Sequence, residues 1–323
     1  MKGLSLNREF VFRRTDQLSA WEKEQFISLF GRTFPKTING EEFERKYACT
    51  PLGYSHHGLM FVEGSLVGAY NLIPYVYNCF GARRLFGLSV DTMVAQEHRG
   101  GPFNLTKMAA LACEGARRDH ISFVFGFPND HAYPFTRHVL KWSDLGELDF
   151  YALPVNIGAL KPKLRWANAV SRLGAGGFVR LPQLGQRRRP DFGIEKIPHE
   201  QFEEHRYGQE HRAIDVGNGG RCVYRTCTEA DGVRTTYIID VTPLTEACFA
   251  RAVRAVYAAA RDTDLLLYVG RLPFRPAGLL KVPPSRRPRR IRMCGKILDH
   301  QLINDRVFNI TNWNINISNF DVR

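Results

Sequence analysis

The sequence lacks the features that would assign the chain to a membrane-spanning, secreted or metal-binding class. No apolar run approaches the length of a membrane-spanning helix, and the first residues show no signal-peptide pattern. The seven cysteines are scattered without a Cys-x-x-Cys pair, so neither a disulfide framework nor a zinc site is expected. We therefore expect a cytoplasmic protein with free thiols and no bound metal.

Acidic residues are scarce relative to basic ones. The chain of 323 residues has 32 acidic and 45 basic side chains, a formal net charge of +13. This excess favours an anionic partner, which includes nucleic acid, an acidic membrane or a phosphate-bearing small molecule. Two arginine runs, at 187–189 and 286–292, lie in proline-containing loops, where a solvated surface explains them as well as a binding site does.

One stretch, residues 88–127, combines a strand, a glycine turn, a helix and a second strand. The strand is expected at 88–95, the turn at 96–101, the helix at 102–118 and the second strand at 121–127. Gly100 and Gly101 permit a sharp turn, and Pro102 suits a first helical turn. Because the first-turn N–H groups of a helix have no partner within it, this arrangement predicts an anion-binding site.

The ordered run "VDTMV", "HRGG", helix, "FVFGFPN" and "AYPF" resembles motifs A and B of the GNAT acyltransferase superfamily. The loop reads Arg-Gly-Gly-Pro, one residue shorter between its glycines than the family pattern. The resemblance covers the first half of the chain well and the second half in outline. It implies a mixed, mostly antiparallel central sheet with one βαβ crossover flanked by helices, an α/β (α+β) fold that we expect to be duplicated.

The resemblance also implies an acyl-coenzyme A site, with acetyl-coenzyme A as the expected co-substrate and no metal. Arg99 and the following N–H groups would hold the pyrophosphate, and a backbone N–H of the fourth strand would stabilise the oxyanion. The expected cofactor-binding residues are Thr92, Met93, Val94, Arg99, Gly100, Gly101, Phe103, Asn104, Asn129 and Tyr133.

Three residues are candidates for catalysis by this resemblance. Tyr133, four residues after Asn129, is the candidate acid for the leaving thiolate, and a packed aromatic explains it equally well. Asp91 on the fourth strand is the first candidate for the general base, and a structural hydrogen-bonded Asp is the competing interpretation. His131 is the alternative base, whereas His56 and His57 are expected to be ordinary strand residues.

The remaining elements of the first half follow from hydrophobic periodicity and turn residues. Helices are expected at 19–31, 41–47 and 130–140, and strands at 9–14, 58–62, 65–77, 142–146 and 149–154. A basic amphipathic helix is expected at 161–172, ended by the glycines at 174–177. It would either touch an anionic membrane or pack between domains.

The second half of the chain repeats the strand, helix and strand order of the first half. Strands at 221–228 and 233–241, a helix after Pro243 and a strand at 264–270 give a second crossover, with Asp240 comparable to Asp91. The turn between them has neither glycine nor cation. Residues 308–320 alternate as a last strand or hairpin. We expect an acyltransferase domain at 1–155, a basic linker at 156–192 and a degenerate GNAT-like domain at 193–323.

These observations predict an N-acyltransferase, most simply an N-acetyltransferase acting on a primary amine of a small molecule. A phosphate-bearing acceptor such as a nucleotide-linked amino sugar would suit the positive charge. The alternatives are a tRNA-dependent aminoacyltransferase-like enzyme of cell-wall synthesis, for which a basic surface would suit RNA, and a non-catalytic GNAT-like binding protein. A homodimer remains open.

Overall fold

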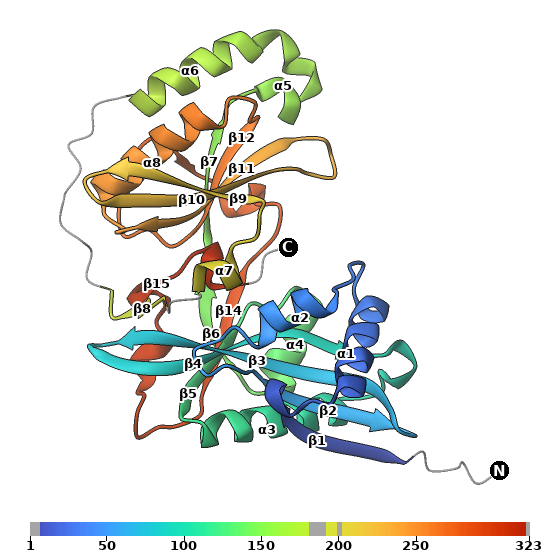
Figure 1. Ribbon diagram of the computed structural model, residues 1–323. Coiled ribbons are helices and arrows are strands. Elements are labelled where there is room, and N and C mark those ends of the chain that lie inside the picture. The colour runs from blue at the N-terminus through green and yellow to red at the C-terminus, as the bar shows by residue number, and fades with distance from the viewer. Residues whose placement is uncertain (1–6, 181–191, 199–201, 321–323) are drawn as a thin grey trace. The chain divides into compact units, whose positions relative to one another are not determined.

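The computed structural model describes residues 7–180, 192–198 and 202–320, which form two compact units (Figure 1). The first unit comprises described residues of Met1–Gly146, Gly193–Arg206 and Ile291–Asn312. The second comprises those of Glu147–Phe192, Tyr207–Arg290 and Trp313–Arg323. The units therefore interleave along the chain, whereas the division expected from the sequence runs in chain order.

The first unit is built on a mixed sheet with the strand order β1-β2-β3-β4-β5-β14-β6, in which β8 also pairs with β3. Only β4 and β5 are parallel among its registered pairs, and α3 connects them. The strands are β1 (Arg8–Arg14), β2 (His56–Val62), β3 (Ser65–Cys79), β4 (Ala82–Val94), β5 (Ile121–Gly126), β6 (Ser143–Glu147), β8 (Ile194–Lys196) and β14 (Arg292–Ile297). The expected mixed, mostly antiparallel fold with one crossover is confirmed.

Helices cover both faces of this sheet (Figure 1). Neighbouring strand residues point to opposite faces, and on β2 His56 stacks on Phe12 beside α3, whereas His57 packs on Phe26 of α1 and Tyr47 of α2. The helices are α1 (Ala20–Thr33), α2 (Gly40–Tyr47), α3 (Phe103–Arg118), α4 (Ala132–Pro134, continued by a π-helical turn at Phe135–Val139) and α7 (Phe202–Arg206). The expected helices at 19–31, 41–47 and 102–118 are confirmed.

Helix α3 lies unusually close to the strands beneath it. A Cβ added at Gly58 of β2 would lie 1.9 Å from the carbonyl oxygen of Met108, and one at Gly115 would lie 2.1 Å from the ring of Phe12. Glycine at these two positions therefore lets the helix backbone approach the sheet, which fixes where α3 begins relative to the end of β4.

The second unit has a sheet with the order β13-β7-β12-β11-β10-β9. Its buried apolar core includes Phe249, Val253 and Tyr268. The elements are β7 (Asp149–Pro154), α5 (Ile157–Leu160), α6 (Asn168–Arg180), β9 (His211–Gly217), β10 (Gly220–Thr228), β11 (Arg234–Thr242), α8 (Glu246–Ala259), β12 (Leu265–Gly270), β13 (Leu280–Lys281) and β15 (Trp313–Asn314).

The two sheets fit a duplicated arrangement. In each, a parallel strand pair is connected by one helix, α3 between β4 and β5 and α8 between β11 and β12. In each, the second parallel strand pairs on its other side with an antiparallel strand, β14 beside β5 and β7 beside β12. Each antiparallel strand comes from a distant part of the chain, which is why the units interleave.

Two expected elements are wrong. The helix expected to end at the glycines of 174–177 instead continues through them as α6, because it packs on α8: Tyr257 donates to the carbonyl of Arg172 and Arg254 to that of Val179. The strand expected at 308–320 is mostly short 3-10 turns around the two-residue β15. Side chains of Asn309 and Asn316 accept hydrogen bonds from the backbone two residues later, which stabilises turns.

Candidate acyl-transfer site

A bulge in β4 forms the centre of the candidate site. Asn71 of β3 pairs with Val90 and Ala69 pairs with Met93, so Tyr70 alone faces two residues of β4, Asp91 and Thr92. Asp91 has a φ of 45°, a left-handed conformation that is uncommon for a residue other than glycine. A strained residue at a bulge is a feature often found at functional sites.

The side chain of Asp91 is held by two donors from the end of α2. Lys46 Nζ lies 2.5 Å from Asp91 Oδ2, and the Tyr47 hydroxyl donates to the same oxygen at 2.6 Å. The Lys46 side chain is 7% exposed and that of Asp91 14%, so this ion pair is largely removed from water. It ties the helix to the bulge.

The backbone of the bulge is held by a second, fully buried chain of polar groups. Asn71 donates through Nδ2 to the carbonyl of Asp91 at 2.8 Å, and its Oδ1 lies 2.8 Å from His57 Nδ1. Since Oδ1 can only accept, His57 must carry its proton on Nδ1, which leaves Nε2 to accept from the Thr15 hydroxyl at 2.9 Å. Burial lowers the pKa of His57 to about 4, so the ring is neutral at pH 7.

The end of β4 has an open edge. Its last pair with β5 joins Ser89 to Gly126, and Val90–Val94 continue beyond it. Ala95 donates to Val67 of β3, so alternation along the strand turns the N–H and C=O of Val94 to the opposite, open edge. Thr92, Met93 and Val94, which were predicted to bind the cofactor, therefore lie on the part of β4 that β5 does not cover.

The turn after β4 is shaped by Arg99 and the two glycines. Arg99 folds back so that its Nε donates to the carbonyl of Val94 at 2.8 Å, beside the open edge. Gly101 has a φ of 69°, which favours glycine, and Gly100 has open space where a Cβ would lie. The loop thus brings exposed backbone and one cation to the end of β4.

Helix α3 begins directly after this turn without a side-chain cap. Among the described residues, no acceptor is found for the backbone N–H groups of Phe103, Asn104 and Leu105, the orphan donors of a first helical turn. Asn104 is buried, and although its Nδ2 donates to the carbonyl of His98, its Oδ1 has no partner. This helix of 16 residues presents free donors and its positive dipole end to the loop.

The residues after β5 make contacts among themselves. Asn129 Oδ1 accepts from the N–H of Ala132 at 2.9 Å, so this side chain begins the helical turn on which His131 is exposed. The Tyr133 hydroxyl donates to Asp144, which raises the pKa of the phenol, and the Arg292 guanidinium lies 4.4 Å from the centre of its ring. The phenol is thus protonated at neutral pH, with its proton directed at Asp144.

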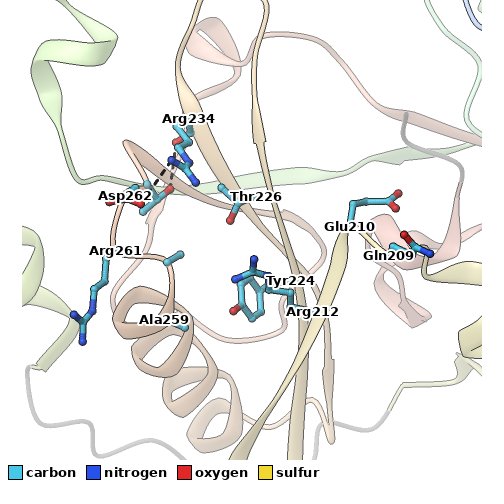
Figure 2. Close-up of a pocket in the computed structure, with 11 residues that line it drawn as sticks. Gln209, Glu210, Arg212, Tyr224, Thr226, Arg234, Ala259, Arg261 and Asp262 are labelled. Carbon is cyan, nitrogen blue, oxygen red and sulfur yellow. Dashed lines mark hydrogen bonds and ion pairs between the residues drawn. The ribbon is translucent and has the colours of Figure 1, made fainter.

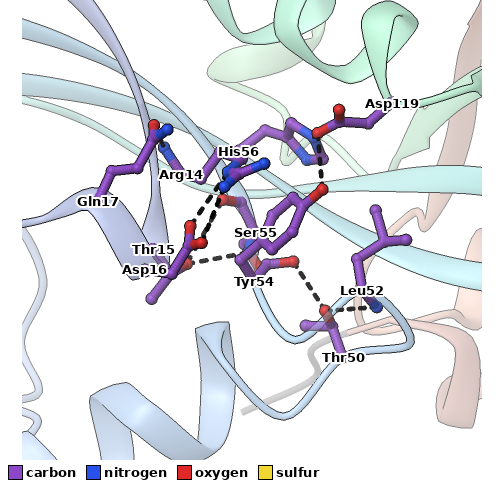
Figure 3. Close-up of polar contacts among 10 residues, drawn as sticks. All are labelled: Arg14, Thr15, Asp16, Gln17, Thr50, Leu52, Tyr54, Ser55, His56 and Asp119. Atoms are coloured by element: carbon purple, nitrogen blue, oxygen red, sulfur yellow. Dashed lines mark hydrogen bonds and ion pairs between the residues drawn. The ribbon is translucent and has the colours of Figure 1, made fainter.

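A separate polar cluster lies at the other end of α3 (Figure 3). Asp119 accepts from the Tyr54 hydroxyl at 3.0 Å and lies 2.8 Å from His56 Nε2, while Arg14 stacks over the Tyr54 ring. Burial lowers the pKa of His56. These contacts join β1, β2 and the end of α3, and they lie beyond the C-terminus of the helix rather than at its ligand-accessible N-terminus.

The second unit has a comparable bulge but a different helix start. Ile239 of β11 is the extra residue opposite Val223 and Tyr224, next to Asp240. The N-terminus of α8, however, is capped by Thr245, whose hydroxyl accepts from the N–H of Cys248 at 3.1 Å. A capped helix without a glycine turn offers fewer free donors to a phosphate.

A pocket of about 400 Å³ opens at the opposite, C-terminal end of α8 (Figure 2). It is lined by Gln209, Glu210, Arg212, Tyr224, Thr226, Arg234, Ala259, Ala260, Arg261, Asp262 and Thr263. Arg234 pairs with Asp262 at 3.7 Å, and the carbonyls of a helix C-terminus repel anions. The pocket is therefore not equivalent to the phosphate-binding feature of the first unit.

The described residues contain no group of three or more His, Cys, Asp or Glu side chains that could hold a metal ion. None of the described helices has the length and apolar character needed to cross a membrane. The arginine run at 187–189 lies outside the described residues. In the second run the side chain of Arg287 is only 6% exposed and donates to the carbonyl of Leu148 and to Asp149.

Sequence reasoning missed Lys46, Asn71 and His57. Asn71 could have been found as the one amide in the otherwise apolar centre of β3, and His57 as a polar residue of a strand whose other residues are mostly apolar. Lys46 gave no signal, because a lysine in the last turn of a helix is ordinarily a solvated partner of the dipole.

Comparison with known proteins agrees with this geometry. Residues 14–139 match the family described as acetyltransferase (GNAT) domain. No curated protein matches the sequence.

Solved structures share the fold at low identity. A probable N-acyltransferase from Enterococcus faecalis V583 aligns with a TM-score of 0.59 and 12% identity over 91% of this chain and 74% of its own. A GCN5-related N-acetyltransferase from Kribbella flavida aligns at 0.56 and 13% over 90% and 72%. Saccharomyces cerevisiae N-myristoyltransferase with bound myristoyl-CoA aligns at 0.51 and 12% over 91% and 81%. Residues 14–139 of this chain are thus similar to a GNAT acetyltransferase domain, and the solved structures share the fold.

Proposed function

We propose that the chain is an acyl-coenzyme A-dependent N-acyltransferase, most simply an N-acetyltransferase, that acts on a primary amine of a small molecule. One observation carries the proposal: the uncapped N-terminus of α3 follows the open edge of β4 after a short glycine-containing turn. The helix N-terminus suits the phosphates of an acyl donor, and the open strand edge suits its acyl arm.

The residues of the loop fit a pyrophosphate. The orphan N–H groups of Phe103, Asn104 and Leu105 are hydrogen-bond donors, Arg99 adds a cation, and Gly100 leaves room for the ligand where a side chain would stand. Acetyl-coenzyme A would supply an activated thioester at this site. The protein's part is to bind its phosphates and to orient the acyl arm along β4.

Along β4, the N–H of Val94 at the open edge is the candidate oxyanion donor, and Thr92 and Met93 belong to the same segment of the strand. The rigid bulge matters here, since a donor helps only where it is aimed before the reaction. The two polar chains that reach Asp91, one through Lys46 and Tyr47 and one through Asn71, hold that segment in place.

Proton transfers are assigned by position. Asp91 Oδ2 is bound to two donors, so a general-base role falls to its Oδ1, acting directly or through water, and His131 is the alternative base. Tyr133 is protonated and can serve as the acid for the leaving thiolate once its hydroxyl turns from Asp144. The net charge of +13 supports a phosphate-bearing acceptor, such as a nucleotide-linked amino sugar.

The test is a turnover assay that detects free coenzyme A thiol, run with acetyl-coenzyme A and a panel of primary amines that includes amino-sugar nucleotides. We expect amine-dependent thiol release that disappears in Arg99→Glu. The matched control is Arg289→Glu, an exposed arginine of the second unit. If no amine increases thiol release, or if Arg99→Glu turns over as fast as the control, the proposal is contradicted.

A further inference from the structure

An exposed apolar stripe runs along α6 and the turn before it. Trp166 is 80% exposed, Val170 68% and Leu173 78%. These residues are spaced by four and three positions, so within a helical segment they lie on one side. The opposite side, with Ala175 and Val179, is buried against α8.

The same segment carries only positive charge. Residues 156–180 contain no Asp or Glu, and all five of their basic side chains are exposed: Lys161, Lys163, Arg165, Arg172 and Arg180. Residues 265–298 also contain no Asp or Glu, but Leu280 is the only large apolar side chain among them that is exposed. Among the described residues, no ion pair is found for these five cations. Large apolar side chains in such surroundings are costly in water and uncommon on a protein surface that has no partner.

We propose that this face, residues 161–173, docks on the surface of an anionic lipid bilayer. The indole and aliphatic side chains would enter the interface between headgroups and acyl chains, where tryptophan is favoured, while the lysines and arginines bind the lipid phosphates. The chain would thus be a peripheral membrane protein, a property that goes beyond the proposed acyl transfer and does not depend on it.

Charge and shape argue against two other occupants. A second copy would bring the same four cations, Lys161, Lys163, Arg165 and Arg172, against this face, and like charges repel. Single-stranded RNA would satisfy the cations, but bases are bound by stacking on aromatic rings, and Val170 and Leu173 provide none. A lipid surface satisfies the aliphatic residues and the cations together.

The experiment is sedimentation of the full chain with vesicles of phosphatidylcholine alone or mixed with phosphatidylglycerol. We expect binding to the mixed vesicles at low salt, little binding to neutral ones, and a steep decline as salt rises. The chain should bind with or without acetyl-coenzyme A. Failure to bind mixed vesicles at low salt would overturn the proposal.

Variants assign the binding to this face. Trp166→Ser with Leu173→Ser should lower the partition coefficient at least about tenfold, whereas Leu302→Ser, an exposed leucine of the first unit, should not. Lys163→Glu with Arg165→Glu should cause a loss of similar size, while Arg286→Glu with Arg289→Glu changes the net charge equally and should retain most of the binding. Equal losses in both charge-reversed pairs would show attraction to the whole chain and overturn the assignment.

Two further measurements exclude the other occupants. Light scattering without lipid should give the same mass for the wild type and for the Trp166→Ser, Leu173→Ser variant. A wild-type dimer that the variant loses would make this face a self-interface and overturn the proposal. Binding of single-stranded RNA that these variants abolish, with no vesicle binding, would overturn it in favour of RNA.

Discussion

Lys46 Nζ lies 2.5 Å from Asp91 Oδ2, which joins the last turn of α2 to the bulge of β4 across 45 positions of the sequence. Both side chains are largely buried. A second ion pair in the same unit has the same length, Lys23 to Glu44, but its side chains are 31% and 47% exposed. Comparing the two pairs therefore separates the effect of burial on the free energy of unfolding from the effect of distance.

Removing one partner of the buried pair should destabilise the protein strongly. Lys46→Met leaves the Asp91 carboxylate with one donor fewer in a poorly solvated site, and we expect a loss of about 3 kcal/mol in the free energy of unfolding. Lys23→Met should cost less than about 1 kcal/mol, because an exposed pair contributes little. Urea unfolding of both variants measures the difference. Equal losses would show that the Lys46–Asp91 pair has no special role.

The close approach of α3 to β2 predicts a severe effect of one methyl group. Gly58→Ala places a Cβ 1.9 Å from the carbonyl oxygen of Met108, so helix and strand must separate, at a cost of about 3 kcal/mol or more. Gly40→Ala at the start of α2 meets nothing within 4 Å and should leave the melting temperature unchanged or slightly raised. A wild-type melting temperature for Gly58→Ala would contradict the packing described for α3.

Stability should fall as the pH is lowered from about 6.5 to about 4. Burial lowers the pKa of His57 from 6.5 to about 4, so in this range the unfolded chain binds a proton that the folded chain does not. The stability contributed by neutral His57 is fully present above pH 6.5 and is lost by pH 4, about 3 kcal/mol in all. His57→Gln should flatten the pH dependence of urea unfolding, and His131→Gln, at an exposed site, should not. The same slope in all three proteins would rule out His57 as its source.

The assignment of Asp91 as base separates from that of His131 in steady-state kinetics. If Asp91 accepts the amine proton, Asp91→Asn should lower kcat by about 100-fold with a smaller change in KM for acetyl-coenzyme A, and His131→Gln should have little effect. The reverse pattern would transfer the role to His131. Circular dichroism of Asp91→Asn is needed alongside, because this residue also anchors the bulge.

Much of the fold was predictable because its signals are local. The helix expected from Ser19 is α1, where Ser19 and Glu22 form a capping box, and the strands expected at 58–62 and 65–77 are β2 and β3, joined at Glu63-Gly64. Local signals failed where tertiary packing decides. The glycines of α6 remain helical because the helix packs on α8, where Gly176 lies close to the Tyr257 hydroxyl.

The candidate site was predictable in part for the same reason. The glycine turn and the start of α3 are contiguous in sequence, so their local geometry could be inferred from the residues alone. The contacts of Asp91 could not, because Lys46 and Asn71 reach it from two other elements and His57 holds Asn71 from a third. Only the folded arrangement shows that this carboxylate is already bound to two donors.

The central claim is that the turn at 99–101 and the start of α3 bind acetyl-coenzyme A, and a thermal-shift titration tests it most directly. A ligand at 100 times its dissociation constant stabilises the folded state by about 2.7 kcal/mol, so the melting temperature of the wild type should rise. A Cβ added at Gly100 meets nothing within 4 Å in the protein alone, so Gly100→Val should keep the ligand-free melting temperature and lose the rise. Gly174→Val, at another glycine with open space, should keep both. No rise in the wild type, or a full rise in Gly100→Val, would contradict the account.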